Sequence, residues 1–160
     1  RYGLGAFIKD SAAAGVDGIL ILDLPPEESE DYSQLMAESG LCPVFLVAPT
    51  TPESRIKSIV EHGKGFIYYV SREGVTGMQS KVSGNISSMI DRIHQHTDLP
   101  IAVGFGISNP DQAKAVAEMG DAIVVGSAIV NQIAEQGKSD TLVPTVSHFV
   151  GSLAQAVKEV

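Results

Sequence analysis

The stretch Asp17–Leu24 reads DGILILDL and is the first of several similar short apolar runs in the 160-residue chain. The recurrence of this kind of run decides the fold. None of these runs alternates cleanly between polar and apolar residues. Continuous apolar runs of this length are typical of strands buried on both faces, as in a parallel sheet. We therefore predict five buried strands, at Asp17–Leu24, Pro43–Ala48, Gly65–Val70, Pro100–Gly104 and Asp121–Gly126.

Signals for helix starts and ends lie between these runs. Thr51-Pro52-Glu53 and Asn109-Pro110-Asp111 each combine an N-cap residue, a proline for the first helical position and an acid for the first turn. A glycine shortly before a strand favours the left-handed conformation that ends a helix. We expect helix ends at Gly15, Gly40, Gly63 and Gly120, and further helices over Pro25–Ser39, Ser127–Gln136 and Pro144–Glu159.

Strict alternation of strands and helices predicts an α/β fold in a single domain, residues 1–160. Periodicity alone leaves two architectures open. One is an open doubly wound sheet, which suits this length. The other is part of a (β/α)8 barrel, which usually needs about 250 residues. Both place ligands at the carboxyl ends of the strands.

Composition excludes several classes of function. The chain has a formal net charge of −8, whereas a nucleic-acid-binding protein needs a basic surface. No apolar run approaches the ~20 residues of a membrane-spanning helix. The single cysteine, Cys42, cannot form an internal disulfide, and the four histidines lack the spacing of a metal site. We expect no nucleic-acid partner, no membrane partner and no metal.

Two glycine-containing turns follow the fourth and fifth predicted strands. The first holds Gly104, Phe105 and Gly106, and the second holds Gly126 and Ser127 just before a short helix. Glycine lets backbone N–H groups approach an anion, and a helix N-terminus adds N–H donors and partial positive charge. Either turn alone is more often a simple strand end. The pair predicts a phosphate-binding site.

The third strand and the long connection after it add three candidates, and the end of the first strand adds a fourth. Gly77 offers a further backbone donor, and Arg72 offers a cation. Both lie in a segment that is either a lid over a ligand or a solvated loop. Tyr68 either reaches the pocket or belongs to the core. Asp23 ends the first strand and is either an acid–base carboxylate or a helix cap. These residues form no complete catalytic set.

Four motifs together resemble the tryptophan synthase alpha family. They are Asp17–Ser29 (DGILILDLPPEES), Tyr69–Gly77 (YVSREGVTG), Gly104–Ser108 (GFGIS) and Gly126–Val130 (GSAIV). The resemblance covers essentially the whole chain and corresponds to strands four to eight of the family's barrel. It implies a (β/α)8 TIM barrel, of which this chain supplies about the last five βα units, with the upstream strands one to three absent.

The resemblance also implies a function. The family is a cytoplasmic carbon–carbon lyase of tryptophan biosynthesis that cleaves indole-3-glycerol phosphate to indole and glyceraldehyde 3-phosphate by a retro-aldol step. Its catalytic Glu and Asp are expected upstream of Arg1, so we expect no catalytic residue here and no activity of this segment alone. The resemblance places Gly77, Gly104, Phe105, Gly106, Gly126 and Ser127 at the substrate phosphate, and Tyr68, Arg72 and Thr76 in the active-site wall and lid.

The same resemblance implies partners and alternatives. The family needs no cofactor of its own, because pyridoxal phosphate belongs to the partner beta subunit of an alpha2-beta2 tetramer. Two other functions stay open at this point. One is another phosphate-binding barrel enzyme, and the other is a non-catalytic phosphate-binding half-barrel.

Overall fold

The computed structural model describes residues 2–71 and 79–160. By their internal contacts these fall into two compact units. The first comprises Arg1–Tyr69 with Asp91–Ile101, and the second comprises Val70–Ile90 with Ala102–Val160. The boundary between the units therefore runs through a strand, a helix and the following strand, and each unit is described by itself below.

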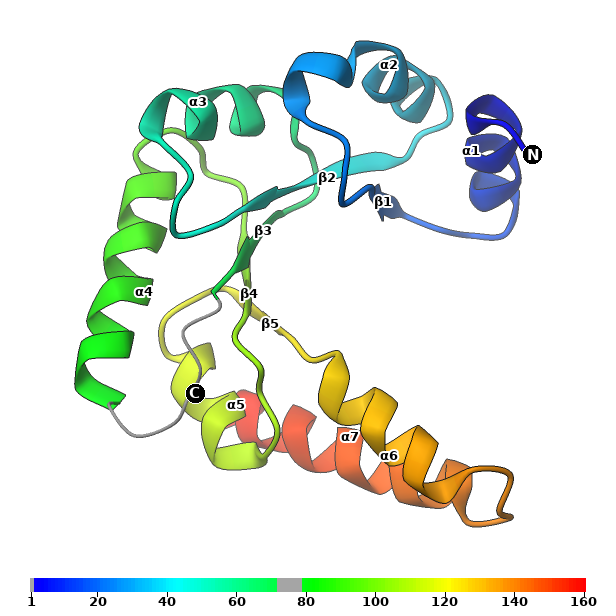
Figure 1. Cartoon of the computed structure of the whole chain (residues 1–160), viewed down its shortest axis with the longest axis vertical. Coiled ribbons are helices and arrows are strands. Elements are labelled where there is room, and N and C mark those ends of the chain that lie inside the picture. The colour runs from blue at the N-terminus through cyan, green and yellow to red at the C-terminus, as the bar shows by residue number, and fades with distance from the viewer. Residues whose placement is uncertain (1, 72–78) are drawn as a thin grey trace. The chain divides into compact units, whose positions relative to one another are not determined.

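The first unit alternates helices with parallel strands. Helices α2 and α3 both pack on β2 (Figure 1). The parallel ladder places Gly18 opposite Cys42 and Phe45 opposite Ile67. The elements of this unit are α1 (Leu4–Ala13), β1 (Gly18–Leu20), the 3-10 helix η1 (Pro26–Glu28), α2 (Glu30–Glu38), β2 (Cys42–Val47), α3 (Glu53–His62) and β3 (Ile67–Val70).

The second unit continues the same alternation. Its strands pair in parallel, with Gly104 opposite Val124. Helix α7 packs against both α5 and α6 (Figure 1). The elements are α4 (Gln79–His94), which the unit boundary crosses, β4 (Ile101–Gly104), α5 (Pro110–Ala117), β5 (Ala122–Val124), α6 (Ser127–Gln136) and α7 (Leu142–Lys158).

Strand order distinguishes the two architectures that the sequence left open. The sheet runs β1-β2-β3-β4-β5, in the order of the chain. A doubly wound sheet needs a point where the strand order reverses, and a barrel does not. The unbroken order therefore favours the barrel architecture over the doubly wound sheet.

Burial on both faces, predicted for five strands, is found in β2 and β4, whereas β1 and β5 contain no buried residue and β3 alternates. All four residues of β4 are buried, and so are four of the six residues of β2. The helices contribute one apolar face each: Met36 of α2 and Ile56 of α3 are fully buried. The core therefore lies around β2 and β4, and the prediction of burial on both faces is wrong for β1 and β5, which stand at the two ends of the strand order.

Several helix boundaries differ from the predictions by a few residues. Pro52 is the N-cap of α3 rather than its first helical residue, while Thr51 accepts a hydrogen bond from the Ala48 amide at 2.9 Å. Helix α7 begins two residues before Pro144. Gly15 and Gly40 end their helices with φ of 84° and 71°, as predicted, whereas Gly63 caps α3 in the extended conformation.

Candidate functional site

The two predicted phosphate turns lie at the same edge of the β4–β5 pair. Val103 pairs with Ile123 and Gly104 with Val124, so both strands end at the same level. Parallel strands end at one edge of a sheet, which brings the segment after Gly104 close to the segment that leads to Gly126. This register supports the prediction that the two turns are neighbours.

Apolar side chains fix the first turn. Phe105 and Ile107 are 4% and 2% exposed, while Gly106 between them is exposed. Gly106 has φ of 65°, a conformation that side chains rarely adopt, so glycine is required there. The backbone amide of Ser71 donates to the Gly104 carbonyl at 2.9 Å, which ties the end of β4 to the residue after β3.

The segment after this turn is held by its own side chains. Asn109 caps α5 by accepting from the Gln112 amide at 2.9 Å. The Gln112 side-chain oxygen in turn accepts from the amide and the hydroxyl of Ser108, at 2.8 and 3.0 Å. The loop between β4 and α5 is therefore ordered by three hydrogen bonds around one glutamine.

The second turn opens a helix that suits an anion. Gly126 is the N-cap of α6 and has no side chain to cap the helix. The first N–H groups of an α-helix have no intrahelical acceptor and carry partial positive charge. Helix α5 has Asp111 in its first turn, whereas the first turn of α6 holds no acidic residue. Ser127 and Gly126 are both exposed, so a ligand can reach this helix end.

The remaining predicted site residues lie elsewhere. Tyr68 is half-buried in β3 of the first unit, and its neighbour Tyr69 is 1% exposed, as expected for side chains on opposite faces. Arg72, Thr76 and Gly77 lie outside the described residues. Asp23 is exposed after β1, and η1 has no side-chain cap, so the helix-cap alternative for Asp23 is not supported.

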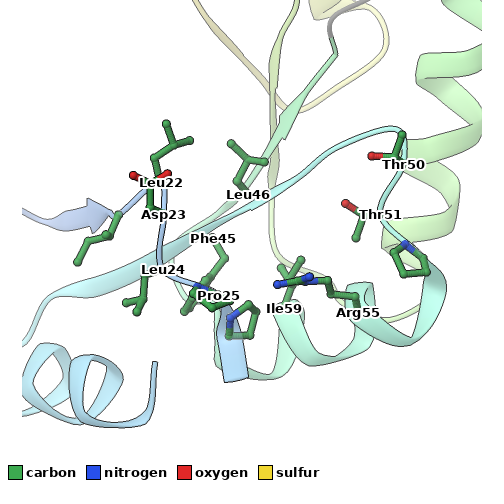
Figure 2. A pocket seen from close by; sticks show the side chains of 13 residues that line it. Leu22, Asp23, Leu24, Pro25, Phe45, Leu46, Thr50, Thr51, Arg55 and Ile59 are labelled. Carbon is green, nitrogen blue, oxygen red and sulfur yellow. The ribbon is translucent and has the colours of Figure 1, made fainter. Parts of the chain in front are cut away.

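The first unit also contains a cavity that was not predicted. It measures about 430 Å³ and lies at the carboxyl ends of β1 and β2 (Figure 2). Asp23, Thr50, Thr51 and Arg55 supply its polar groups. The rule that ligands bind at strand carboxyl ends points to this place, because Asp23 lies at the end of the first predicted strand and Thr50 follows the second.

In the described part of the chain, none of the helices is long and apolar enough to cross a membrane. Within the same residues no three His, Cys, Asp or Glu side chains come together as a metal site would need.

Comparison with known proteins identifies the family. The family model described as "Tryptophan synthase alpha chain" matches residues 1–158. The chain belongs to the tryptophan synthase alpha chain family. The tryptophan synthase alpha chain of Opitutus terrae is 46% identical over 158 residues, which cover 98% of this chain and 59% of the relative. The relative from Geotalea uraniireducens is 44% identical over 159 residues and is also 59% covered.

Solved structures agree with this membership. The alpha subunit of tryptophan synthase from Legionella pneumophila superposes with a TM-score of 0.85 at 33% identity, covering 99% of this chain and 58% of that one. The tryptophan synthase complex from Pyrococcus furiosus gives a TM-score of 0.76 at 33% identity, covering 94% and 61%. The fold class is thus the family's (β/α)8 barrel, of which this chain forms five βα units. The chain spans about three fifths of the length of these relatives.

Proposed function

We propose that this chain provides the phosphate-holding part of a lyase that cleaves indole-3-glycerol phosphate to indole and glyceraldehyde 3-phosphate. One observation carries the proposal. The turn Gly104-Phe105-Gly106 and the N-terminus of α6 at Gly126-Ser127 follow paired strands that end at one level. Loops after two neighbouring barrel strands, together with a short helix, form the recurrent phosphate site of barrel enzymes.

Each group in this proposed site has a defined role. The amide groups at Gly106 and at the start of α6 donate to the phosphate oxygens, and the Ser127 hydroxyl adds another donor. Buried Phe105 holds the first turn in place. Gly77 adds a further backbone donor for the phosphate. Tyr68 contributes to the wall of the active site, and Arg72 and Thr76 contribute to its lid. No side chain with negative charge lies in the first turn of α6 to repel the ligand.

The retro-aldol step needs an acid for the indole carbon and a base for the hydroxyl beside the breaking bond. The residues that serve these roles in the family match no position of this chain. We therefore propose that residues 1–160 bind the phosphate without turnover, and that a protein carrying the full barrel is the active lyase. It needs no cofactor, works in the cytoplasm and pairs with a beta subunit that holds pyridoxal phosphate in an alpha2-beta2 tetramer.

The test has two arms. The chain is titrated with glycerol 3-phosphate and followed by NMR at the amides of Gly106, Gly126 and Ser127. Saturable shifts at these amides are expected, and their absence at about 10 mM ligand would refute the phosphate site. In the second arm, turnover of indole-3-glycerol phosphate by residues 1–160 alone would refute the assignment of catalysis to residues outside this chain.

A further inference from the structure

A side chain at the start of α5 holds the segment that leaves the first candidate phosphate turn. The turn Gly104-Phe105-Gly106 leads through Ser108 to α5, where Gln112 lies. We propose that Gln112 is a positioning residue, which fixes the backbone amide of Gly106 for a phosphate oxygen by holding Ser108. The role rests on the proposed function, because it concerns the same phosphate site, and it adds a residue that lies outside the four motifs of the sequence.

The side-chain oxygen of Gln112 accepts two hydrogen bonds from Ser108. Oε1 of Gln112 lies 2.8 Å from the backbone nitrogen of Ser108 and 3.0 Å from its Oγ. The backbone N–H of Ser108 can only donate, so the Gln112 atom that faces it must be the oxygen. An amide oxygen has two lone pairs, one for each of these donors. A single acceptor therefore holds both the backbone and the side chain of Ser108.

Gln112 is itself held in place by its helix. Its backbone amide donates to Asn109 Oδ1 at 2.9 Å. Ala113 and Val116 of the same helix are 0% and 3% exposed, so α5 is anchored in the core. The acceptor for Ser108 thus stands on a fixed helix and not on the loop that it orders.

The turn is tied down on both sides of its exposed glycine. On the entry side, the Ser71 amide donates to the Gly104 carbonyl at 2.9 Å. On the exit side, Ile107 is buried, and Ser108 after it donates the two hydrogen bonds described above. Gly106 between these anchors is exposed and has φ of 65°. Glycine has more backbone freedom to lose than any other residue, so these anchors restrict Gly106 before a ligand arrives.

A donor that is already in place raises affinity, because the ligand does not have to order it on binding. Loss of the two bonds at Ser108 frees the exit side of the turn, so a phosphate must then order Gly106 itself. The other role open to Gln112 is helix capping alone, since a Gln three residues after the N-cap often bonds back to the start of the helix. In that role Gln112 would affect the stability of α5 and leave phosphate affinity unchanged.

The experiment compares Gln112→Met with the wild-type chain by NMR. Methionine is similar in length and lacks the acceptor oxygen. Amide hydrogen exchange at Ser108 reports the hydrogen bond and should become about fivefold faster, while the order parameter of the Gly106 amide should fall. The Kd for glycerol 3-phosphate, followed at the amides of Gly126 and Ser127, should rise about fivefold.

Two further variants grade and restore the effect. Ser108→Ala removes only the hydroxyl bond and should raise the Kd about twofold. Gln112→Glu keeps an oxygen that can accept both bonds from Ser108, so exchange at the Ser108 amide should return to the wild-type rate. Because glutamate adds a negative charge, the titrations are made at about 0.5 M NaCl, where exposed charges more than about 5 Å apart are largely screened. The affinity of Gln112→Glu should then lie closer to wild type than to Gln112→Met.

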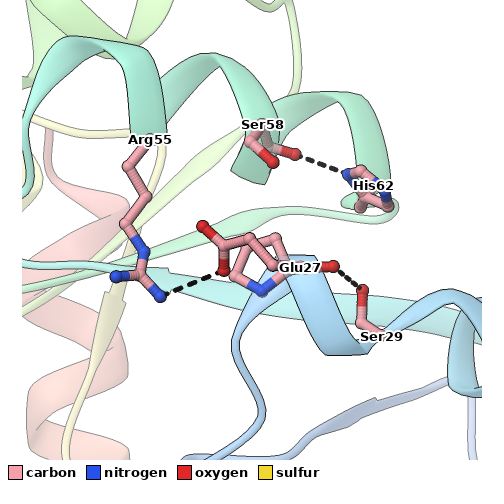
Figure 3. Close-up of polar contacts among 6 residues, drawn as sticks. Glu27, Ser29, Arg55, Ser58 and His62 are labelled. Atoms are coloured by element: carbon pink, nitrogen blue, oxygen red, sulfur yellow. Dashed lines mark hydrogen bonds and ion pairs between the residues drawn. The ribbon is translucent and has the colours of Figure 1, made fainter.

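Ser29→Ala controls for a loss of stability alone. Ser29 is 0% exposed in the first unit, and its hydroxyl donates to the Pro26 carbonyl at 2.8 Å (Figure 3). Removing this buried hydroxyl should lower the free energy of unfolding and leave the Kd for glycerol 3-phosphate unchanged.

The outcomes separate the role of Gln112 from the proposed function. Absence of glycerol 3-phosphate binding by the wild type would overturn both. If the wild type binds, wild-type affinity in Gln112→Met would overturn the role of Gln112 alone. The same holds for an unchanged exchange rate at Ser108, for a loss of affinity that Gln112→Glu does not restore, and for an equal loss in Ser29→Ala.

Discussion

The phenolic hydroxyl of Tyr32 donates a hydrogen bond to the backbone carbonyl of Ile19 over 2.5 Å. Tyr32 belongs to α2 and Ile19 to β1, so this bond fastens the helix to the first strand. The Tyr32 ring is 2% exposed and meets the ring of Phe45 in β2 edge-on, at 6.3 Å between centroids. One side chain thus joins a helix and two strands beside the cavity that Phe45 lines.

Replacing Tyr32 by phenylalanine should lower the free energy of unfolding by about 1 to 2 kcal/mol. The variant keeps the ring packing and removes only the hydroxyl, so the loss reports the bond to Ile19. Urea denaturation followed by circular dichroism measures it. The control is Tyr2→Phe, which removes a hydrogen bond from an exposed hydroxyl to Asp10 and should change stability by less than about 0.5 kcal/mol. Equal losses in the two variants would contradict the assigned role of Tyr32.

Tyr32 also makes stability depend on pH. Burial raises the pKa of Tyr32 to about 12, against about 10 in an unfolded chain. The folded state therefore holds this proton more tightly, and the resulting stabilisation is complete below about pH 10 and is lost as the pH rises through about 12. The stability difference between wild type and Tyr32→Phe should be constant from about pH 7 to 9 and shrink above pH 10. A difference that stays constant to about pH 12 would disprove this linkage.

Gly18 marks a close approach between two strands. A Cβ at this position would lie 2.9 Å from the Cys42 carbonyl oxygen of the paired strand β2. Gly18→Ala should therefore destabilise the protein by about 1 to 3 kcal/mol, as overpacking does. Gly5→Ala is the matched control, because a Cβ at Gly5 in α1 meets no atom within 4 Å. This substitution also replaces glycine, a poor helix former, with alanine, a good one. Chemical denaturation should show opposite signs for the two substitutions, and two losses of similar size would contradict this account.

The position of every strand could be predicted from its apolar run, but the length of the first strand could not. The run Asp17–Leu24 forms only the short strand Gly18–Leu20. The ladder with β2 ends where Leu20 pairs with Val44, and Leu22 beyond it is 72% exposed. The apolar pattern is the same whether the residues pair in a sheet or line a cavity. The residue at which β1 ends therefore depends on tertiary contacts and cannot be predicted from the pattern.

The two candidate phosphate turns could be located in the sequence, whereas the cavity could not. Both turns carry glycine at the end of a predicted strand, but only Gly106, with φ of 65°, has a backbone conformation that requires glycine. The cavity instead depends on Arg55, which lies in α3 four residues before the buried Ile59. The sequence does not distinguish this arginine from an ordinary solvent-exposed cation. Only the packing of α3 on β2 shows that Arg55 faces a cavity.

Asn109 holds the start of α5, a few residues after the turn Gly104-Phe105-Gly106. Its side-chain oxygen accepts from the Gln112 amide at 2.9 Å. Asn109→Ala removes this cap and should cost about 1 kcal/mol of unfolding free energy. Asn109→Asp keeps an acceptor at the same place and should retain most of that stability. Thermal unfolding of the two variants measures the difference, and equal losses would show that the cap does not act through its side-chain oxygen.

Gly126 tests the phosphate site without disturbing the fold. A Cβ there meets no atom within 4 Å, and φ of −115° is open to any residue, so Gly126→Ala should change stability by less than about 1 kcal/mol. The methyl group would nevertheless occupy the space above the first N–H groups of α6, where a phosphate oxygen must approach. We expect the affinity for glycerol 3-phosphate to fall about tenfold or more, measured by NMR titration. Gly151→Ala is the matched control, because its Cβ is equally unobstructed within α7, and it should leave phosphate affinity unchanged. If both variants bind glycerol 3-phosphate like the wild type, the N-terminus of α6 does not hold the phosphate.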